Sequence, residues 1–290
     1  MIATTVLPRF ADIADRYDVL FCDVWGVLHN GRNNYPAACE ALVRFRQERG
    51  PVVLISNSPR PSSDVVAQLR ALGVPDEAWS RFVTSGDATR VELSKRSPGP
   101  AWAVGPARDA PLYEGTGVGY AETPYEASFV SCTGPFDDDK DQPEDYRERF
   151  EVCVERGLTM VCANPDKVVH RGAKLIWCAG ALADLYAELG GQVVMAGKPF
   201  APIYDAVMAE AADLMGGAPD PSRVLCVGDG IPTDVLGANK AGLDVLFVVG
   251  TGIHGAEATG PDGELDHGLI EQMLAKAGAE AKYAIRDLVW

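Results

Sequence analysis

Four widely separated segments of the chain each end in side chains suited to chemistry on a phosphoryl group. They are Asp23 after "VLFC", Ser56 and Asn57 after "VVLI", Lys198 in "GKP", and Asp229 with Asp234 in "GDGIPTD". A carboxylate can attack phosphorus and form an aspartyl-phosphate, which divides one difficult step into two easier ones. A hydroxyl, a lysine and a Mg²⁺ ion would stabilise the negative charge of the transferring group. The set therefore predicts a metal-assisted phosphoryl-transfer site.

Each of these signals, taken alone, also has an ordinary structural explanation. An aspartate at the end of a strand is common in turns, a Ser-Asn pair often precedes a helix, and a single lysine is commonly a surface residue. The "GDGIPTD" segment is more specific, because Gly228 permits a close backbone approach. The spacing of Asp229 and Asp234 can aim both carboxylates at one site. The order of all four segments along the chain favours a site over coincidence.

The elements that must position these residues follow an alternating pattern of short apolar runs and helix-like stretches. The apolar runs predict strands within residues 18–24, 51–57, 81–86, 192–199, 222–230 and 244–250. The intervening stretches predict helices within residues 35–50, 61–73, 87–96, 200–216 and 232–242, and a final helix with a short tail within 263–290. This alternation is typical of a parallel sheet covered by helices on both faces. Ligands bind such sheets outside the carboxyl ends of the strands, where the four segments end.

The segment between residues 98 and 192 interrupts this pattern. It follows "SPGP", a cluster of residues that break regular structure, and contains strand-like and helix-like stretches of its own. We therefore predict a Rossmann-like parallel α/β core formed by residues 1–97 and 193–290, with an inserted α/β domain formed by residues 98–192. The acidic stretch "FDDDKDQPED" within the insert is expected to be a solvated connection.

The composition excludes several classes of protein. Of the 290 residues, 47% are hydrophobic and 23% charged, which is ordinary for a soluble globular chain. A formal net charge of −15 argues against binding to nucleic acid or to an anionic membrane surface, because both need a basic face. No apolar run reaches the roughly 18 residues of a membrane span, and we expect no signal peptide because the first residues include no long apolar region and carry acids early. The seven cysteines form no C-x-x-C pair, so we expect a cytoplasmic protein with reduced core cysteines.

The order of the four motifs resembles that of the haloacid dehalogenase-like hydrolases. "DVWGVLHNG" is similar to the first motif of that family, "LISNSP" to the second, "GKP" followed by "IYDA" to the third, and "VGDGIPTDVLGANKAG" to the fourth. The insert between the second and third motifs, with "ANPD" inside it, resembles the class II cap of the 4-nitrophenylphosphatases and pyridoxal phosphate phosphatases. The resemblance covers nearly the whole chain. It implies a Rossmann-like core, a mobile cap and Mg²⁺-dependent phosphoryl transfer.

The resemblance also implies a ligand set for the metal ion. Asp23 would be both the nucleophile and a Mg²⁺ ligand, and the backbone carbonyl of Trp25 would be a second ligand. Asp229 would be a further ligand, and Asp234 would support the metal directly or through water. Mg²⁺ is therefore the expected cofactor.

For the substrate, the resemblance implies contacts from two parts of the chain. Ser56 would bind the phosphoryl oxygens with Asn57 beside it, and Lys198 would neutralise charge on the nucleophile and the phosphate. The segment "CANPDKVVHRG" looks like the cap loop that faces the substrate, and the alternative is an ordinary loop between strands. Its polar candidates are Asn164, Asp166, His170 and Arg171. The expected partner is a small phosphorylated metabolite whose identity the sequence does not specify, and a homodimer formed through the cap is a further expectation.

Trp25 departs from the family pattern. The phosphatases of the family carry an aspartate at this position, which protonates the leaving oxygen and then activates the hydrolytic water. An indole can do neither. Loss of such an acid–base group typically costs about 10²–10⁴ in rate.

Three explanations of Trp25 remain open at this point. The first is a slow or atypical phosphatase whose acid comes from the cap, the substrate or His29, for which an exposed loop histidine is the alternative interpretation. The second is a protein that binds a phosphorylated ligand with degenerate catalysis. The third is a dehalogenase-like hydrolase, but related dehalogenases need no Mg²⁺, and "GDGIPTD" indicates that the metal site is retained. We expect the first.

Overall fold

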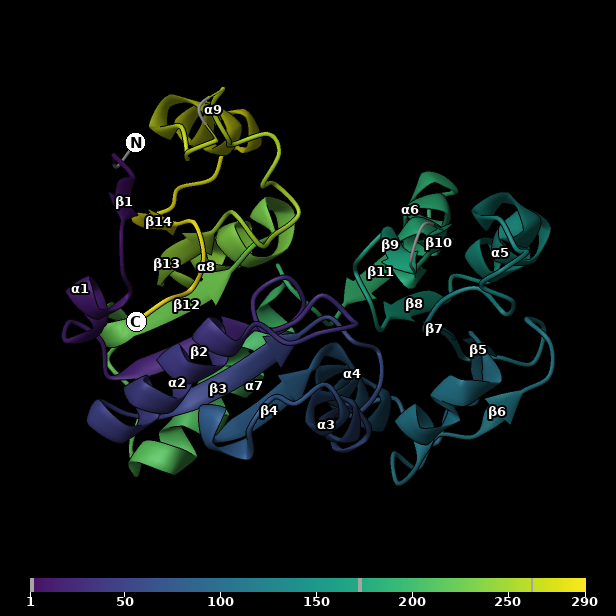
Figure 1. Ribbon diagram of the computed structural model, residues 1–290. Helices are drawn as coiled ribbons and strands as arrows, with labels where there is room; N and C mark the ends of the chain where they lie inside the picture. The colour runs from purple at the N-terminus through teal and green to yellow at the C-terminus, as the bar shows by residue number, and fades with distance from the viewer. Residues whose placement is uncertain (1–2, 172–173, 262) are drawn as a thin grey trace. The chain divides into compact units, whose positions relative to one another are not determined.

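The chain forms two compact units, seen here in a computed structural model. It describes residues 3–171, 174–261 and 263–290, and the side chains of residues 169–175 lie outside the description. The first unit contains residues 1–56, 66–83 and 198–290, and the second contains residues 57–65 and 84–197. Each unit is built around a β-sheet of its own (Figure 1). The predicted fold class, a parallel α/β core with an inserted α/β domain, is confirmed.

Seven strands form the sheet of the first unit, in the order β1-β14-β13-β12-β2-β3-β4. The pairings from β1 through β14, β13, β12 and β2 to β3 are all parallel. The strands are β1 (Thr5–Leu7), β2 (Val19–Asp23), β3 (Val52–Ser56), β4 (Arg81–Thr84), β12 (Val224–Gly228), β13 (Asp244–Val248) and β14 (Tyr283–Ile285). Strands from the beginning and the end of the chain therefore lie side by side.

The central strands β12, β2 and β3 carry the ends of three predicted motifs. Every residue of β2 and β12 is buried, as are the first four of β3, so these strands read as continuous apolar runs. Asp23 pairs with Ile55 of β3, and Cys22 pairs with Val227 of β12. The carboxyl ends of the three strands therefore meet at one edge of the sheet, where Ser56 also lies.

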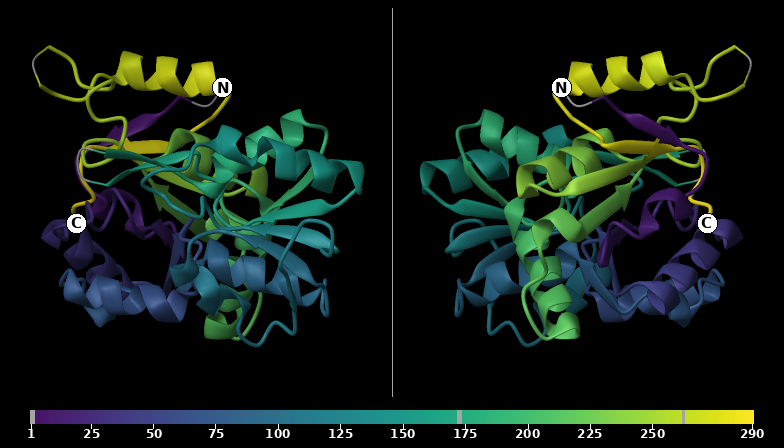
Figure 2. Two further views of the ribbon diagram at one scale, coloured as in Figure 1. Left: turned by 90° about the vertical axis from the view of Figure 1, so that its right-hand side faces the viewer. Right: turned by 90° about the vertical axis from the view of Figure 1, so that its left-hand side faces the viewer.

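Helices connect these strands and supply the apolar cover. They are α1 (Ala11–Ala14), α2 (Pro36–Glu48), α3 (Ser62–Ala71), α7 (Ala201–Met215), α8 (Leu236–Ala241) and α9 (His267–Ala277). Helix α2 begins with a proline in its first turn and buries Ala38, Leu42 and Phe45, which lie on one helical face. Figure 2 shows α9 near the beginning of the described chain, where Nε2 of His267 lies 2.8 Å from the carbonyl oxygen of Thr4.

The second unit contains a five-stranded sheet in the order β11-β8-β7-β5-β6, and all four pairings are parallel. The strands are β5 (Ala101–Val104), β6 (Tyr120–Ala121), β7 (Phe129–Cys132), β8 (Thr159–Cys162) and β11 (Gln192–Met195). An antiparallel pair, β9 (Val168–Arg171) and β10 (Lys174–Trp177), stands apart from this sheet. The helices are α4 (Ser85–Ser94), α5 (Arg147–Glu155) and α6 (Ala179–Glu188).

A hydrophobic core lies on each face of the five-stranded sheet. Val130 and Met160 belong to one core, which includes buried residues of α5 and α6 such as Phe150. Their strand neighbours Phe129 and Val161 belong to the other core, which includes Leu93 of α4 and residues of the loop after β5. Successive strand residues point to opposite faces, so the alternation shows a sheet with helical cover on both sides.

The structure corrects two strand predictions. The segment "QVVMAGKP" was expected to be a strand of the core sheet that ends at Lys198, but β11 pairs with β8 in the sheet of the second unit. The tail after α9 was expected to be irregular, but it contains β14, which pairs with the equally unpredicted β1. Each of these two strands has only three residues, too few for a visible period.

Two further predictions differ in detail. The loop expected at "CANPDKVVHRG" ends early, because Val168–Arg171 forms β9. The apolar run predicts Ser85 and Gly86 at the end of a strand, but they open α4, where Thr84 and Asp87 form a reciprocal capping box. The predicted domain boundaries after residues 97 and 192 stay a prediction. By their contacts, residues 57–65 and 84–97 group with the second unit.

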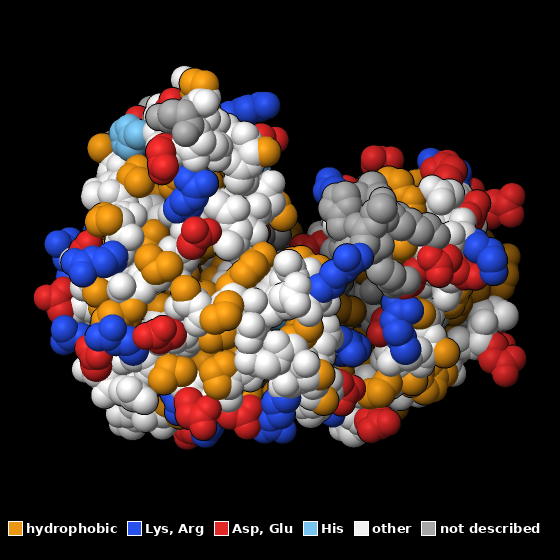
Figure 3. All heavy atoms as spheres, in the orientation of Figure 1, with side chains coloured by type: hydrophobic (Ala, Val, Ile, Leu, Met, Phe, Trp, Pro, Cys, Tyr) orange, Lys and Arg blue, Asp and Glu red, His pale blue; other side chains and the backbone are white. Residues whose placement is uncertain are grey.

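The surface shows no concentration of one charge on the face drawn in Figure 3, where acidic and basic side chains are intermingled. Within the described ranges, no helix is both long enough and apolar enough to cross a membrane. All seven cysteines are buried, as predicted, and none of them takes part in a disulfide.

Candidate active site

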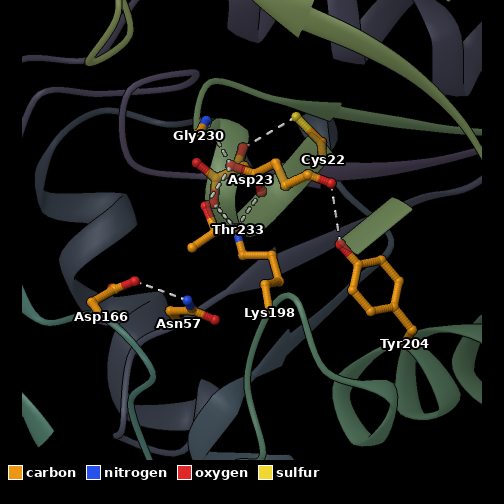
Figure 4. Close-up of polar contacts among 9 residues, drawn as sticks. Cys22, Asp23, Asn57, Asp166, Lys198, Tyr204, Gly230 and Thr233 are labelled. Carbon is orange, nitrogen blue, oxygen red and sulfur yellow. Dashed lines mark hydrogen bonds and ion pairs between the residues drawn. The ribbon is translucent and has the colours of Figure 1, made fainter. Parts of the chain in front are cut away.

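The amine of Lys198 lies between two buried carboxylates in the first unit. Its Nζ donates hydrogen bonds to Oδ1 of Asp23 at 2.5 Å and to Oδ1 of Asp234 at 2.6 Å (Figure 4). Asp23 is the last residue of β2, Lys198 precedes α7, and Asp234 lies in the π-helical turn Ile231–Val235 that follows β12. Three of the four predicted motifs therefore meet in one buried site.

Asp229 completes a cluster of three carboxylates. One ligand oxygen from each of Asp23, Asp229 and Asp234 lies within 4.8 Å of the other two, and all three residues are buried. Three carboxylates against the one ammonium of Lys198 leave two formal negative charges in the cluster. Uncompensated buried charge is costly, and a divalent cation would balance it. The all-oxygen donor set fits Mg²⁺, which prefers carboxylate and carbonyl oxygens.

The proton equilibria of the cluster reflect the same imbalance. Burial raises the pKa of Asp23 well above its usual value, and the charges of Asp234 and Asp229 add to this effect while Lys198 opposes it. Burial and then the charge of Asp234 raise the pKa of Asp229 to about 7. For Lys198, burial disfavours the charged form, but attraction to the two carboxylates outweighs it and the pKa is raised. The lysine therefore stays charged, and a further cation would keep the carboxylates ionised.

The backbone of the fourth motif wraps around Asp234. Oδ2 of Asp234 accepts a hydrogen bond from the backbone N–H of Gly230 at 3.0 Å, and the Thr233 hydroxyl lies 3.4 Å from the same oxygen. A Cβ atom at Gly228 would lie 2.3 Å from Cβ and Cγ of Asp234, so only glycine leaves room for this approach. Gly228 therefore allows the backbone to pack directly against Asp234, and the expected approach to a ligand stays a prediction.

Two residues around Asp229 have a positioning role that sequence reasoning missed. The backbone N–H of Ile253 donates a hydrogen bond to Oδ2 of Asp229 at 3.0 Å. Gly26, at a φ of +86°, approaches the same oxygen so closely that a Cβ atom there would lie 2.3 Å from it. Gly26 had a signal, since it follows Trp25 in the first motif. Ile253 had none, because its contribution is a backbone donor in a loop.

The first motif forms a tight loop in which Trp25 faces outward. The Trp25 side chain is 49% exposed, and its ring meets the His29 ring edge to face, with centroids 5.2 Å apart. Gly31 lies against the far edge of the indole, and a Cβ atom there would lie 2.3 Å from it. The indole is therefore held by its own loop.

His29 does not have the properties of the acid that was considered for it. It is 3% exposed rather than an exposed loop residue, and its Nδ1 accepts a hydrogen bond from the backbone N–H of Gly31 at 3.0 Å. Burial lowers the pKa of His29 to about 4. A ring that is neutral at pH 7 and occupied at Nδ1 is a poor proton donor. Its contacts with Gly31 and Trp25 indicate a structural role in the loop.

The predicted phosphate residues fall on both sides of the division between the units. Ser56 ends β3 in the first unit, one residue beyond the partner of Asp23. In the second unit, the Asn57 amide donates to Oδ1 of Asp166 at 3.0 Å, and Oδ1 of Asn164 accepts from the backbone N–H of Asp166 at 2.9 Å. The structure therefore links Asn57 and Asn164 through Asp166. The predicted contact from the Arg171 side chain lies outside the described residues, as does that from the His170 side chain.

Comparison with protein families gives two matches, and together they include all four motifs. The model of a family described as haloacid dehalogenase-like hydrolase matches residues 20–119, and a second, described as HAD-hydrolase-like, matches residues 195–275. The first match includes the first two predicted motifs. The second includes the third and fourth.

Three similar proteins extend these matches over most of the chain. A hydrolase of the haloacid dehalogenase-like family from Brucella suis 1330, known as a crystal structure, is 44% identical with a TM-score of 0.84, and the alignment covers 98% of this chain and 100% of that chain. Ribonucleotide monophosphatase NagD of Escherichia coli (strain K12) is 25% identical over 230 residues, 79% of this chain and 86% of that protein. A 4-nitrophenylphosphatase structure from Thermotoga maritima shares the fold, with 22% identity, a TM-score of 0.70 and coverage of 95% and 96%.

Proposed function

Because the chain belongs to the haloacid dehalogenase-like hydrolase family, we propose that it is a Mg²⁺-dependent, phosphatase-like hydrolase that acts through an aspartyl-phosphate at Asp23. The observation that carries the proposal is the buried cluster in which Lys198 lies between Asp23 and Asp234. With Asp229 the cluster has three carboxylates and one ammonium group, which leaves two formal negative charges without a partner charge. Similarity to a protein named ribonucleotide monophosphatase supports a small phosphorylated metabolite as the substrate.

The chain's own residues divide the reaction into two displacements. In the first, an oxygen of Asp23 forms a bond to phosphorus while the bond from phosphorus to the leaving oxygen breaks. In the second, water attacks the aspartyl-phosphate, which releases inorganic phosphate and restores the carboxylate. Lys198 neutralises the charge of Asp23 and the transferring group, and the Ser56 hydroxyl donates to a phosphoryl oxygen.

The residues that would hold Mg²⁺ are Asp23, Asp229 and Asp234 together with the backbone carbonyl of Trp25. The bound ion supplies a positive charge that stabilises the phosphoryl oxygens during transfer. Related dehalogenases need no Mg²⁺, so a cluster of three carboxylates that would hold this ion favours the phosphatase over that alternative.

Trp25 makes the proposed activity slow and dependent on the leaving group. A nitrophenolate or a carboxylate departs without a proton, whereas a sugar alkoxide needs one, and the indole cannot donate it. Hydrolysis of the aspartyl-phosphate lacks a base for every substrate. We therefore expect the covalent intermediate to accumulate.

A second candidate function is the binding of a phosphorylated ligand with degenerate catalysis. The observation that favours it is again Trp25, together with the neutral state of His29, since neither ring can move the necessary protons. The cluster would then bind the phosphoryl group without turning it over. Kinetics separate the two functions.

Several features complete the proposal. Residues 98–192 serve as the cap, and Asn57, Asn164 and Arg171 contact the substrate. We expect a cytoplasmic protein, without a nucleic-acid or membrane partner, that forms a homodimer through the cap. Similarity to a monophosphatase supports only the small phosphorylated substrate among these points.

Rapid-quench release of phosphate from 4-nitrophenyl phosphate, with and without Mg²⁺, tests the proposal. Wild type should show a Mg²⁺-dependent burst of nitrophenolate followed by slow release of phosphate, and Asp23→Asn should lose both phases. Trp25→Asp should raise the steady rate. Asp76→Asn, which changes an exposed carboxylate paired with Arg70, is the matched control and should behave like wild type.

Three outcomes decide between the alternatives. An Asp23→Asn variant that turns over as fast as wild type would show that Asp23 is not the nucleophile. Brisk hydrolysis of glycerol phosphate by wild type, without a burst, would show that another group supplies the acid and the base. Phosphate binding without a burst would favour the ligand-binding function.

A further inference from the structure

We propose that Trp25 and Ile253 form an apolar receptor for a planar, aromatic leaving group, an aryl ring attached directly to the departing oxygen, beside the phosphoryl site. This inference rests on the proposed function, because it names the class of substrate that the same site would select. It concerns two residues of the first unit only. Ile253 lies outside all four motifs.

The first observation is that the backbones of both residues meet at one carboxylate. The N–H of Ile253 donates to Oδ2 of Asp229, and Gly26, the neighbour of Trp25, approaches the same oxygen. Gly252, the neighbour of Ile253, is just as close, since a Cβ atom there would lie 2.4 Å from Cβ of Asp229. Trp25 and Ile253 therefore project from chain segments on the border of the carboxylate cluster.

The second observation is that both side chains are apolar and open to solvent. Trp25 is 49% exposed and Ile253 is 67% exposed. Most large apolar side chains of the described residues are buried, so these two are exceptions. Exposed apolar area is costly in water, at about 25 cal/mol per Å², so a pair that borders a ligand site indicates a surface that the ligand covers.

The third observation is that the indole is already held in place. Its ring lies edge to face against the buried His29 ring, at an interplanar angle of 76°, and its far edge contacts Gly31. Ordering a mobile side chain costs affinity when a ligand binds, and a side chain that is fixed beforehand avoids this cost. Gly31 makes the arrangement possible because any larger residue would occupy the space of the indole.

The chemistry of the two side chains selects an aromatic partner. An indole offers a broad π face that stacks on planar rings, and the branched side chain of isoleucine adds apolar area without a hydrogen-bonding group. A sugar polyol would lose hydrogen bonds to water against such a surface and gain none. The position that carries an acid in the family's phosphatases would here bind the leaving group rather than protonate it.

Calorimetry with phosphonates that cannot be hydrolysed tests the inference without turnover. The probes are inorganic phosphate, methylphosphonate, phenylphosphonate and cyclohexylphosphonate, each titrated in the presence of Mg²⁺. Wild type should bind phenylphosphonate about tenfold more tightly than methylphosphonate, because stacking on an aromatic side chain has an effect of this order. It should also prefer the planar phenyl ring to the cyclohexyl ring.

Three variants measure the contributions of the two side chains. Trp25→Leu keeps an apolar side chain and should lose the preference for phenylphosphonate over cyclohexylphosphonate. Trp25→Ala should lose this preference too, and also most of the preference for phenylphosphonate over methylphosphonate. Ile253→Ser changes a side chain that is two-thirds exposed and should reduce phenylphosphonate affinity about threefold. Met215→Ala is the control, because Met215 is an exposed apolar residue at the far end of α7, about 20 Å along the helix from its start.

The outcomes separate this inference from the proposed function. A wild type that binds inorganic phosphate but shows no preference for phenylphosphonate contradicts the inference alone. The same holds if Trp25→Ala and Ile253→Ser keep the full wild-type preference. A wild type that binds none of the phosphate probes contradicts the proposed function and the inference together.

Discussion

The carboxylates of the buried cluster and those of the acidic loop in the second unit meet opposite electrostatic conditions. In the first unit, Asp23, Asp229 and Asp234 gather around one ammonium group and leave two formal negative charges. In the second unit, the loop over residues 136–145 carries more acidic residues than this cluster, and they are all within one short stretch of the sequence. Acid density in the sequence would rank the loop as the stronger candidate for a cation site.

The structure reverses this ranking, because the loop satisfies its acids with groups of the second unit. Asp137 pairs with Lys140 at 2.8 Å, and Asp138 pairs with Arg108 at 2.6 Å. Oδ2 of Asp141 accepts a hydrogen bond from the Tyr146 hydroxyl at 2.6 Å. The predicted solvated connection is exposed or half-buried at each of its residues, and these carboxylates have partners within the second unit.

The difference indicates that negative charge without a partner, rather than the number of acidic residues, identifies a site for a cation. A carboxylate with a local partner contributes to the fold and has no need of a cation. A carboxylate held against like charges in a buried space destabilises the fold until a cation arrives. Sites of the second kind are retained for function at a cost in stability.

The largest effect that we expect concerns Asp229 in the absence of metal. Asp229→Asn removes one buried negative charge while its Oδ1 can still accept from the Ile253 N–H, so the metal-free protein should gain about 1–3 kcal/mol in free energy of unfolding. Urea denaturation in EDTA measures this. Asp138→Asn, which breaks the pair with Arg108, is the matched variant and should lose stability. A loss of stability in Asp229→Asn as well would contradict the comparison.

A smaller effect should follow from removing one hydroxyl of the acidic loop. The Tyr146 hydroxyl donates to Asp141 and accepts from the backbone N–H of Phe136 at 2.6 Å. Tyr146→Phe leaves that N–H without its acceptor and should cost about 1–2 kcal/mol of stability without changing phosphatase activity. Denaturation and steady-state assays check both points, with Tyr125→Phe as the control because Tyr125 is 70% exposed. A change in activity would mean that the loop contributes to the site.

The smallest effect is a pH dependence of stability that originates at Asp109, beside the acidic loop. Burial raises the pKa of Asp109 above its usual value, although a hydrogen bond from Thr133 opposes the shift. The folded state thus keeps a proton that the unfolded state has lost, so this contribution to stability falls as pH rises from about 4 through the folded pKa. The free energy of unfolding of Asp109→Asn, relative to that of wild type, should therefore be higher at pH 7 than at pH 4.

A control of opposite sign exists at Asp76. The hydrogen bond from Arg70 lowers the pKa of Asp76, so its contribution is present above the unfolded pKa and lost as pH falls. The free energy of unfolding of Asp76→Asn, relative to that of wild type, should be lower at pH 7 than at pH 4. Denaturation midpoints at the two pH values test both variants, and the same trend in both would show that the pH dependence has another source.

The sequence was sufficient to predict the residues of the cluster because their motifs end strands or begin turns. Asp23 and Ser56 end parallel neighbouring strands, and such strands must share an edge. The spacing of Asp229 and Asp234 was informative because a turn brings side chains at this separation together. Trp25 could be recognised as unusual because its position in the motif was defined.

Other features were beyond prediction because they depend on tertiary packing. The apolar pattern of β11 is compatible with either sheet, and only its pairing with β8 shows that it belongs to the sheet of the second unit. The three-residue strand β1 is placed by its pairing with β14 from the other end of the chain, and β14 also pairs with β13. The burial of His29 in its loop follows from no pattern in the sequence, and the contribution of Ile253 is a backbone N–H, which no residue type reveals.

The most direct test of the difference between the two acidic groups is a calorimetric titration of Mg²⁺ into three proteins. We predict that wild type and Asp138→Asn bind Mg²⁺ at one site with the same affinity, and that Asp229→Asn binds it at least about tenfold more weakly. Undiminished affinity in Asp229→Asn, or loss of the site in Asp138→Asn, would contradict the assignment of the buried cluster as the magnesium site.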